Sequence, residues 1–359
     1  MDGPEGMMSG MASSPIFIHS LFRSGSTWLF DRFRRAKGAS YWCYQEPFHE
    51  FLSHLKRDPD RLLDVHGDMV AAMRHPLIEQ PYFYEFHAIR DQIRDLFTPC
   101  LSFESFFDTT VCPSLDNYVH ALIVGAQSRP LLQCCRSWGR MRHLRDVHGG
   151  LHIHLWRNPW DQWWSYQVAE YFETSNLFIL NAKNPPAVIA ALGEVVGFER
   201  KRAAGLHRDP EHMGRGALGA RDRYRLFYAF WLYSFLEVRP LADCDVNIDA
   251  LTGMPGYREH VGRQWDALGI RNVDLSGCKV PQGVYGREER DFFLSVEEEV
   301  HEVFRRAGYA QGAIADAQRV RDAHWPRGQD DAESLKAMAT RARTVALRLM
   351  DEMAQGSAG

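Results

Sequence analysis

Residues 16–38 have the sequence IFIHSLFRSGSTWLFDRFRRAKG. The run IFIHS is short and rich in β-branched and aromatic residues, so it predicts a strand at 16–20. From Thr27 onward the apolar residues recur at helical spacing, basic residues gather near the end, and Gly38 offers a C-cap. The loop RSGST at 23–27 is therefore expected to join a strand to the N-terminus of a helix.

This position suits the binding of an anion. A helix N-terminus presents unpaired backbone N–H groups and the positive end of the helix dipole. Gly25 lets the backbone approach a ligand closely, and Arg23 adds a fixed positive charge. Ser24, Ser26 and Thr27 complete the loop, the last two as hydroxyl donors. A capped helix with a surface arginine is the alternative for this unit alone.

Four further strands follow, separated by helical patterns. This strand–helix–strand rhythm predicts an α/β fold with a parallel sheet and helices on both faces. The predicted strands lie at 40–44, 131–135, 151–156 and 244–249.

The chain is long enough for one large domain. Its Gly-rich, charged stretch 205–223 predicts a mobile flap. The apolar stripe near the C-terminus predicts a packing helix, with a homodimer contact as the alternative. The expected organisation is a disordered lead at 1–14, one domain at 15–325 with helical insertions at about 48–128 and 170–223, and a helical tail at 326–359.

Composition excludes several classes of protein. The net charge of −4 gives no reason to expect nucleic-acid binding, so an anionic ligand needs a local cluster of positive groups.

The start of the chain lacks the pattern of a signal peptide, and the longest apolar stretch, 226–236, is too short to span a bilayer. Seven cysteines without C-x-x-C spacing indicate a reduced, cytoplasmic protein with buried thiols. The pattern G-x-x-x-x-G-K-[ST] is absent from the sequence, so an ATP-type kinase or GTPase loses its main support.

A second candidate anion site lies in LHIHLWRNPWDQWWSY at 151–166. Arg157 follows the predicted strand at its carboxyl end, where open α/β sheets bind ligands. Ser165 lies eight residues later, about two turns into the next helix. An arginine in this position can bind a phosphate bidentately, and the serine hydroxyl can add a further bond. The alternative is an ordinary β–α turn with a proline at the start of the helix.

Together the two segments resemble the family of sulfotransferases that use 3′-phosphoadenosine 5′-phosphosulfate (PAPS). The run RSGSTW at 23–28 is similar to the family's 5′-phosphosulfate loop, and Arg157-Asn158-Pro159 with Ser165 is similar to its 3′-phosphate site. The resemblance implies a P-loop-NTPase-like parallel sheet. It also implies transfer of a sulfuryl group from PAPS to a hydroxyl group, with PAP as product and no metal.

The resemblance extends to three weaker features. Trp28 is expected to stack on adenine, with a core tryptophan as the alternative. Gln282 and Gly283 belong to a G-x-x-G run similar to the loop that closes over the 3′-phosphate, although Pro281-Gln282 replaces the basic pair common there. Glu46-Pro47, about twenty residues after the loop, resembles the carbohydrate sulfotransferase branch, while RSGST also resembles the tyrosylprotein branch. The expected acceptor is therefore a glycan or glycolipid hydroxyl, with a phenol or peptide tyrosine as the alternative. A protein that binds PAPS without catalysing transfer is the rival hypothesis for the function as a whole.

Acceptor activation needs a base. Glu46 follows the predicted strand 40–44 and is expected at the same sheet edge as the loop, where desolvation would raise its pKa. The alternative is that Glu46 only pairs with a loop arginine, in which case His49 and Glu50 are the substitutes. Arg136, after the strand 131–135, is expected to contact the sulfuryl group or the acceptor.

Other polar and aromatic residues have simpler interpretations. His152 and His154 form H-x-H on a predicted strand, a pattern that can bind metal but lacks a nearby third ligand and is more typical of core histidines. Several aromatic side chains are candidates for the floor of a sugar site, with the core as the alternative. These are Trp42, Tyr44, Trp160, Trp163 and Trp164.

Overall fold

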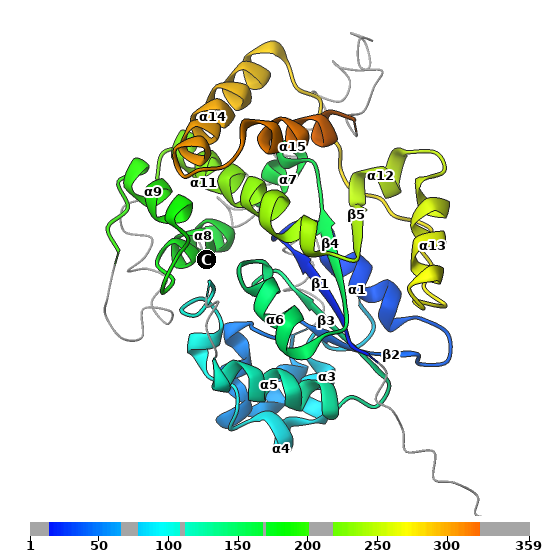
Figure 1. Cartoon of the computed structure of the whole chain (residues 1–359). Helices are drawn as coiled ribbons and strands as arrows, with labels where there is room; N and C mark the ends of the chain where they lie inside the picture. Colours follow the sequence, from blue (N-terminus) through cyan, green and yellow to red (C-terminus); the bar gives the residue numbers. More distant parts are fainter. Residues whose placement is uncertain (1–13, 66–77, 108–111, 168–169, 201–217, 324–359) are drawn as a thin grey trace, which may run out of the picture.

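A parallel β-sheet forms the centre of the molecule (Figure 1). The computed structural model describes residues 14–65, 78–107, 112–167, 170–200 and 218–323. All neighbouring strands are parallel, in the order β2-β3-β1-β4-β5, so the prediction of an α/β fold with a parallel sheet is confirmed. The strands are β1 (Ile16–Ser20), β2 (Tyr41–Gln45), β3 (Arg129–Cys134), β4 (Leu151–Trp156) and β5 (Cys244–Asn247).

The two sides of β1 show that the sheet is covered on both faces. Ile16 and Ile18 belong to one hydrophobic core, whereas Phe17 between them belongs to a second core on the opposite face. Side chains alternate between the two faces of a strand, so a strand covered on both faces has no polar side to show. The first core includes Phe33 of α1 (Ser26–Arg34), and the second includes Tyr118 of α5 (Pro113–Val124). Helices therefore cover both faces.

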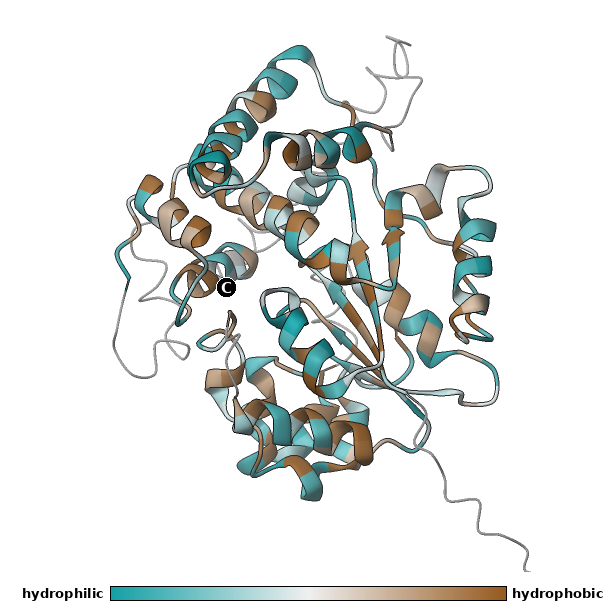
Figure 2. Cartoon of the chain, in the orientation of Figure 1, coloured by the Kyte–Doolittle hydropathy of each residue, from teal (hydrophilic) through white to brown (hydrophobic). Residues whose placement is uncertain are grey.

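The remaining helices build the layers around the sheet, and Figure 2 shows both hydrophobic and hydrophilic residues along them. The segment between β2 and α5 contains several short helices in its described parts. It contains η1 (Glu50–Lys56), η2 (Pro59–Leu63), α3 (Tyr84–Ala88), α4 (Arg90–Ile93) and η3 (Pro99–Leu101). After β3 come η4 (Trp138–Arg140), α6 (Met141–His148), α7 (Pro159–Tyr166), α8 (Glu170–Leu180), α9 (Ala187–Val195), α11 (Ala220–Tyr233), η6 (Ser234–Val238) and η7 (Arg239–Leu241). The chain after β5 forms α12 (Ile248–Gly253), α13 (Tyr257–Ala267), α14 (Arg287–Arg306) and α15 (Gln311–Ala323).

The first helix is shorter than predicted. It ends at Arg34 and not at Gly38, because Gly38, with a φ of +72°, lies in the turn that leads into β2. The long apolar stretch lies in α11 and η6 and is buried. Across the described ranges, no helix combines the length and apolar character that a bilayer span requires. The predictions for 1–13, for most of the flap (205–217) and for the tail (326–359) lie outside the described residues.

Candidate functional site

The carboxyl ends of the five parallel strands lie at one edge of the sheet. The connection after β1 leads through α1 to β2 on one side, whereas the connection after β4 leads to β5 on the other side. Because β1 and β4 are neighbours, the chain leaves this pair in opposite directions. Open α/β sheets bind their ligands at such a switch point, so the loops after β1 and β4 define the candidate site.

The loop after β1 has an unusual backbone. Arg23 has a φ of +66° and Gly25 has a φ of +79°, both in the left-handed region. Gly25 is the N-cap of α1 and has no side chain that could accept a hydrogen bond from the first N–H groups of the helix, and the first turn of α1 carries no acidic residue. No carboxylate of this turn thus competes with an anionic ligand for the positive end of the helix.

A glutamine of α7 fixes the shape of this loop. Gln162 Nε2 donates to the Phe22 carbonyl oxygen (2.7 Å) and to Ser24 Oγ (2.9 Å). Ser24 Oγ in turn donates to the Leu21 carbonyl oxygen at 2.7 Å. Ser24 is buried, so its hydroxyl holds the loop together from the inside.

The two other hydroxyls of the loop are also buried. Ser26 Oγ lies 3.6 Å from Cys135 Sγ, at the end of β3, and Thr27 is buried beside it. Both hydroxyls were expected to donate to a ligand, and neither side chain is open to solvent in this structure. The groups that the loop offers to a ligand are therefore mainly its backbone N–H groups and Arg23, which is half-buried.

The two arginines of the predicted anion sites meet at one residue. Arg23 Nε donates to the Ser165 carbonyl oxygen at 3.1 Å, and Arg157 Nη1 donates to Ser165 Oγ at 2.9 Å. The guanidinium of Arg23 also lies over the ring of Phe172, 5.4 Å from its centroid. The loops after β1 and β4 thus bring two positive charges together at the switch point.

Arg157 is buried and has three partners. Its Nε donates to Asp249 Oδ1 at 3.1 Å, and its Nη2 donates to the Pro281 carbonyl oxygen. Asp249, just after β5, also accepts the backbone N–H of Asn158 at 2.7 Å. Burial raises the pKa of Asp249 to about 6, although the charge of Arg157 opposes this rise. Asp249 was not predicted as a site residue; it was the last residue of the predicted strand 244–249, whereas β5 ends at Asn247 and Asp249 lies in the first turn of α12.

The segment after Pro281 is anchored to α7. The Gly283 N–H and the Tyr285 hydroxyl both donate to Asp161 Oδ1, each at 2.6 Å. Burial raises the pKa of Asp161. Gln282 and Gly283 were predicted to cover the 3′-phosphate site. They directly follow Pro281, whose carbonyl oxygen accepts from Arg157, and both are half-buried.

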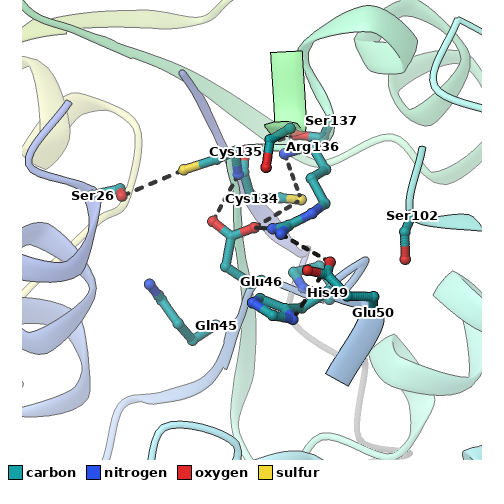
Figure 3. Close-up of polar contacts among 12 residues, drawn as sticks. Ser26, Gln45, Glu46, His49, Glu50, Ser102, Cys134, Cys135, Arg136 and Ser137 are labelled. Atoms are coloured by element: carbon teal, nitrogen blue, oxygen red, sulfur yellow. Dashed lines mark hydrogen bonds and ion pairs between the residues drawn. The ribbon is translucent and has the colours of Figure 1, made fainter. Parts of the chain in front are cut away.

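Glu46 lies at the end of β2, in a strained and buried position (Figure 3). Its φ is +53°, its Oε1 accepts the Cys135 N–H at 2.9 Å, and its Oε2 accepts Arg136 Nη1 at 2.7 Å. Glu46 is thus held in an ion pair, but with the arginine after β3 and not with Arg23 of the loop. Its carboxylate reaches the loop through Cys135, which Ser26 also contacts.

Arg136 is an internal counter-ion. Its side chain is 1% exposed, its two terminal nitrogens bind Glu46 and Glu50, and it also contacts the Tyr171 hydroxyl. This differs from the expectation that Arg136 contacts the sulfuryl group or the acceptor, because its charged atoms already bind two carboxylates in the interior.

The exposed part of this cluster consists of His49 and Glu50, whose side chains are 24% and 30% exposed. Glu50 accepts Arg136 Nη2 at 3.0 Å and the Tyr171 hydroxyl at 2.8 Å. Burial alone would raise the pKa of Glu50, but His49 and Arg136 outweigh it and lower the pKa to about 2. Burial lowers the pKa of His49, whose Nδ1 accepts the Phe51 N–H at 3.1 Å. These two residues, together with the Tyr171 hydroxyl that Glu50 accepts, form the rim of the cluster. At neutral pH the rim therefore offers an ionised carboxylate and a largely neutral imidazole.

The histidines and cysteines of the sheet lie in the core. His152 Nδ1 and His19 Nε2 lie 3.0 Å apart, while His154 contacts Asp245 at 2.8 Å, and all three histidines are buried. All seven cysteines are free thiols, and burial raises the pKa of Cys135. Among the residues that the structure describes, no group of three or more potential ligands could hold a metal ion.

Most of the aromatic candidates for a sugar site are core residues. Tyr44, Trp160 and Trp163 are buried, whereas Trp164 is 53% exposed on α7. Trp28 is half-buried at the start of α1, with Arg32 over its ring at 5.8 Å. Trp28 also packs against the core that contains Phe33, so its partial exposure leaves both the stacking role and the core role open.

Comparison of the chain with known protein families, with curated proteins and with solved structures finds no match. The site must therefore be interpreted from its own geometry. Besides Asp249, two residues of α7, Gln162 and Asp161, were not predicted as site residues. Both precede Ser165 at helical spacing, so they lie on the same face of α7.

The close contact of Gly25 with α12 leads to a first prediction. An added Cβ at Gly25 would lie 2.7 Å from Ile248 Cγ1, whereas at Gly38, with a similar φ, it would meet no described atom within 4 Å. Gly38→Ala should lower the free energy of unfolding by about 1–2 kcal/mol through backbone strain alone. Gly25→Ala should lose about 1–3 kcal/mol more through overpacking. Denaturant unfolding measures both, and equal losses would contradict the contact.

The low pKa of Glu50 leads to a second prediction. Its folded pKa of about 2 lies below the ordinary value of 4.5, so ionised Glu50 stabilises the fold above pH 4.5 and loses this contribution as the pH falls toward 2. Glu50→Gln should therefore cost about 1.5–3 kcal/mol at neutral pH, and the difference from the wild type should shrink below pH 4.5. Glu104→Gln, in an exposed pair with Lys183, is the control and should cost less than about 1 kcal/mol. A difference that does not depend on pH would count against the ion-pair cluster.

Proposed function

We propose that this chain is a PAPS-dependent sulfotransferase with a P-loop-NTPase-like sulfotransferase fold. It transfers the sulfuryl group of PAPS to an acceptor hydroxyl and releases PAP. The observation that carries the proposal is the meeting of Arg23 and Arg157 at Ser165. A nucleotide with a phosphosulfate at one end and a phosphate on its ribose needs two cationic sites at one sheet edge, and these two arginines supply them.

The two ends of the donor bind to different loops in this proposal. The 5′-phosphosulfate binds to Arg23 and to the backbone N–H groups at the start of α1, from Ser24 to Thr27. The 3′-phosphate binds to Arg157 and Ser165, under the segment that contains Gln282 and Gly283, and adenine stacks on Trp28. The uncapped end of α1 supports the first assignment, because a helix N-terminus without its own acidic residue favours an anion.

The chemistry is an in-line displacement at sulfur. The acceptor oxygen forms a bond to sulfur while the bond between sulfur and the bridging oxygen of PAPS breaks, and the electron pair stays on the 5′-phosphate of PAP. Arg23 and the loop N–H groups stabilise that developing negative charge, in the way that preorganised donors stabilise charge in other transfer reactions. No metal is required by this scheme.

The acceptor proton moves to Glu46. Its Oε1 accepts the Cys135 N–H, and its Oε2 accepts Arg136 Nη1 and, at 3.9 Å, the Cys134 thiol. A lone pair on Oε1 is left for a hydroxyl donor. When Glu46 takes up the proton, Arg136 keeps its pairing with Glu50, so the buried guanidinium never loses all of its negative partners. The alternative is that Glu46 has only a structural role. That role would use the same contacts, and the Glu46→Gln variant distinguishes the two.

The acceptor is a glycan or glycolipid hydroxyl in this proposal, and a phenol or peptide tyrosine is the alternative. His49, Glu50 and Tyr171 at the rim carry polar groups that can bind the hydroxyls of a sugar. Incubation of the full chain with ³⁵S-labelled PAPS and a panel of glycans, lipids and phenols tests the activity and identifies the acceptor class. Absence of label transfer, together with absence of PAP binding by calorimetry, would refute the proposal.

Replacement of the proposed base is the third prediction. Glu46→Gln keeps the volume and the bond to Cys135 but removes the proton acceptor, so kcat should fall by about 10²–10⁴ while PAP binding is retained. Glu85→Gln is the matched control, since Glu85 is buried in an ion pair with Arg34 at the other end of α1. If Glu46→Gln leaves the transfer rate at the level of Glu85→Gln, Glu46 is structural. A chain that binds PAP but transfers no label in any form is a non-catalytic binding module.

A further inference from the structure

Asp249 binds only one side of the Arg157 guanidinium. Its Oδ1 accepts Nε at 3.1 Å, and its Oδ2 accepts the Asn158 backbone N–H at 2.7 Å. Asp249 itself is held at the start of α12, because Asn247 Oδ1 accepts its backbone N–H at 2.8 Å. Both residues of the pair are buried, so neither side chain is free to change its orientation.

This arrangement leaves the terminal nitrogens of Arg157 for other partners. Nη1 donates to Ser165 Oγ, and Nη2 donates to the carbonyl oxygen of Pro281. A carbonyl oxygen is a partially negative acceptor, so the Pro281 oxygen occupies the place that a phosphate oxygen would take beside Ser165.

A second arginine–aspartate pair, at the other end of the same two strands, has the opposite arrangement. Asp243, just before β5, accepts the His152 backbone N–H at 2.8 Å, as Asp249 accepts that of Asn158. However, Asp243 binds both terminal nitrogens of Arg145, each at 2.9 Å. The edge of Arg145 that could bind an anion is therefore already used by a carboxylate, whereas that of Arg157 is not.

We infer that Asp249 is the positioning residue of the 3′-phosphate site: it holds Arg157 by Nε so that both terminal nitrogens face the phosphate, which displaces the Pro281 carbonyl. The inference rests on the proposed function. The Asp249 carboxylate lies near the phosphate and repels it. The inference therefore requires that the affinity gained by orienting Arg157 exceeds the affinity lost to this repulsion. This makes the sign of the effect of removing Asp249 decisive.

The experiment compares the affinities of PAP and adenosine 5′-monophosphate, which lacks the 3′-phosphate, for the full chain by calorimetry. Asp249→Ala should weaken PAP binding by about 10–100-fold, the usual effect of losing a hydrogen bond to a charged group. The affinity for adenosine 5′-monophosphate should be unchanged. Asp249→Asn keeps the volume and one of the two acceptor bonds, and it should show a smaller loss in the same direction.

Asp243→Ala is the matched control, since it breaks an equivalent pair at the opposite end of the strands. It should leave the ratio of the two affinities at the wild-type value even where it lowers the melting temperature. An unchanged ratio in Asp249→Asn, or tighter binding of PAP, would overturn the inference. If the wild type itself does not prefer PAP to adenosine 5′-monophosphate, the proposed 3′-phosphate site fails, and with it the proposed function.

Discussion

Helix α7 holds the loop after β1 against the end of β4. Gln162 donates to the Ser24 hydroxyl and to a backbone carbonyl of the loop, and one turn later Ser165 accepts from both Arg23 and Arg157. These groups are buried or half-buried, so the loss of one bond leaves a polar group without a partner in the interior, which costs more than the bond contributes. The relative position of the two positive charges thus depends on one face of one short helix.

Two buried arginines follow the strands on either side of β1, and their carboxylate partners bind different atoms of the guanidinium. Arg136 follows β3, and both of its terminal nitrogens bind carboxylates, those of Glu46 and Glu50. Arg157 follows β4, and its carboxylate partner, Asp249, binds Nε. A buried charge requires compensation in both cases. Of the two, only the second arrangement satisfies the charge and leaves the terminal nitrogens bound to uncharged acceptors, as the proposed 3′-phosphate site requires.

The sheet could be predicted from the sequence because each strand is a short buried run covered on both faces, and the edge positions of Arg157 and Glu46 followed from where those runs end. The pairing of side chains across the edge could not be predicted. Arg136 meets Glu46 because β3 lies beside β2, and Asp249 meets Arg157 because β5 lies beside β4. That strand order is a property of the whole fold and leaves no local pattern. The end of α1 was misplaced at Gly38 because a glycine with positive φ serves a turn as well as a C-cap.

Among the described residues, five non-glycine residues have a positive φ, and two of them, Arg23 and Glu46, lie at the candidate site. Arg23 and Glu46 both have a positive φ, which costs a non-glycine residue about 1–2 kcal/mol. Such strain persists where surrounding contacts impose it, and it is concentrated at functional sites. At Glu46 the backbone N–H still donates to the Gln133 carbonyl at 2.8 Å, and the left-handed turn then sends the side chain back over the end of β3 to Arg136. The ion pair with Arg136 and the bond from the Cys135 N–H hold the carboxylate at this edge, beside the cysteine that Ser26 of the loop also contacts.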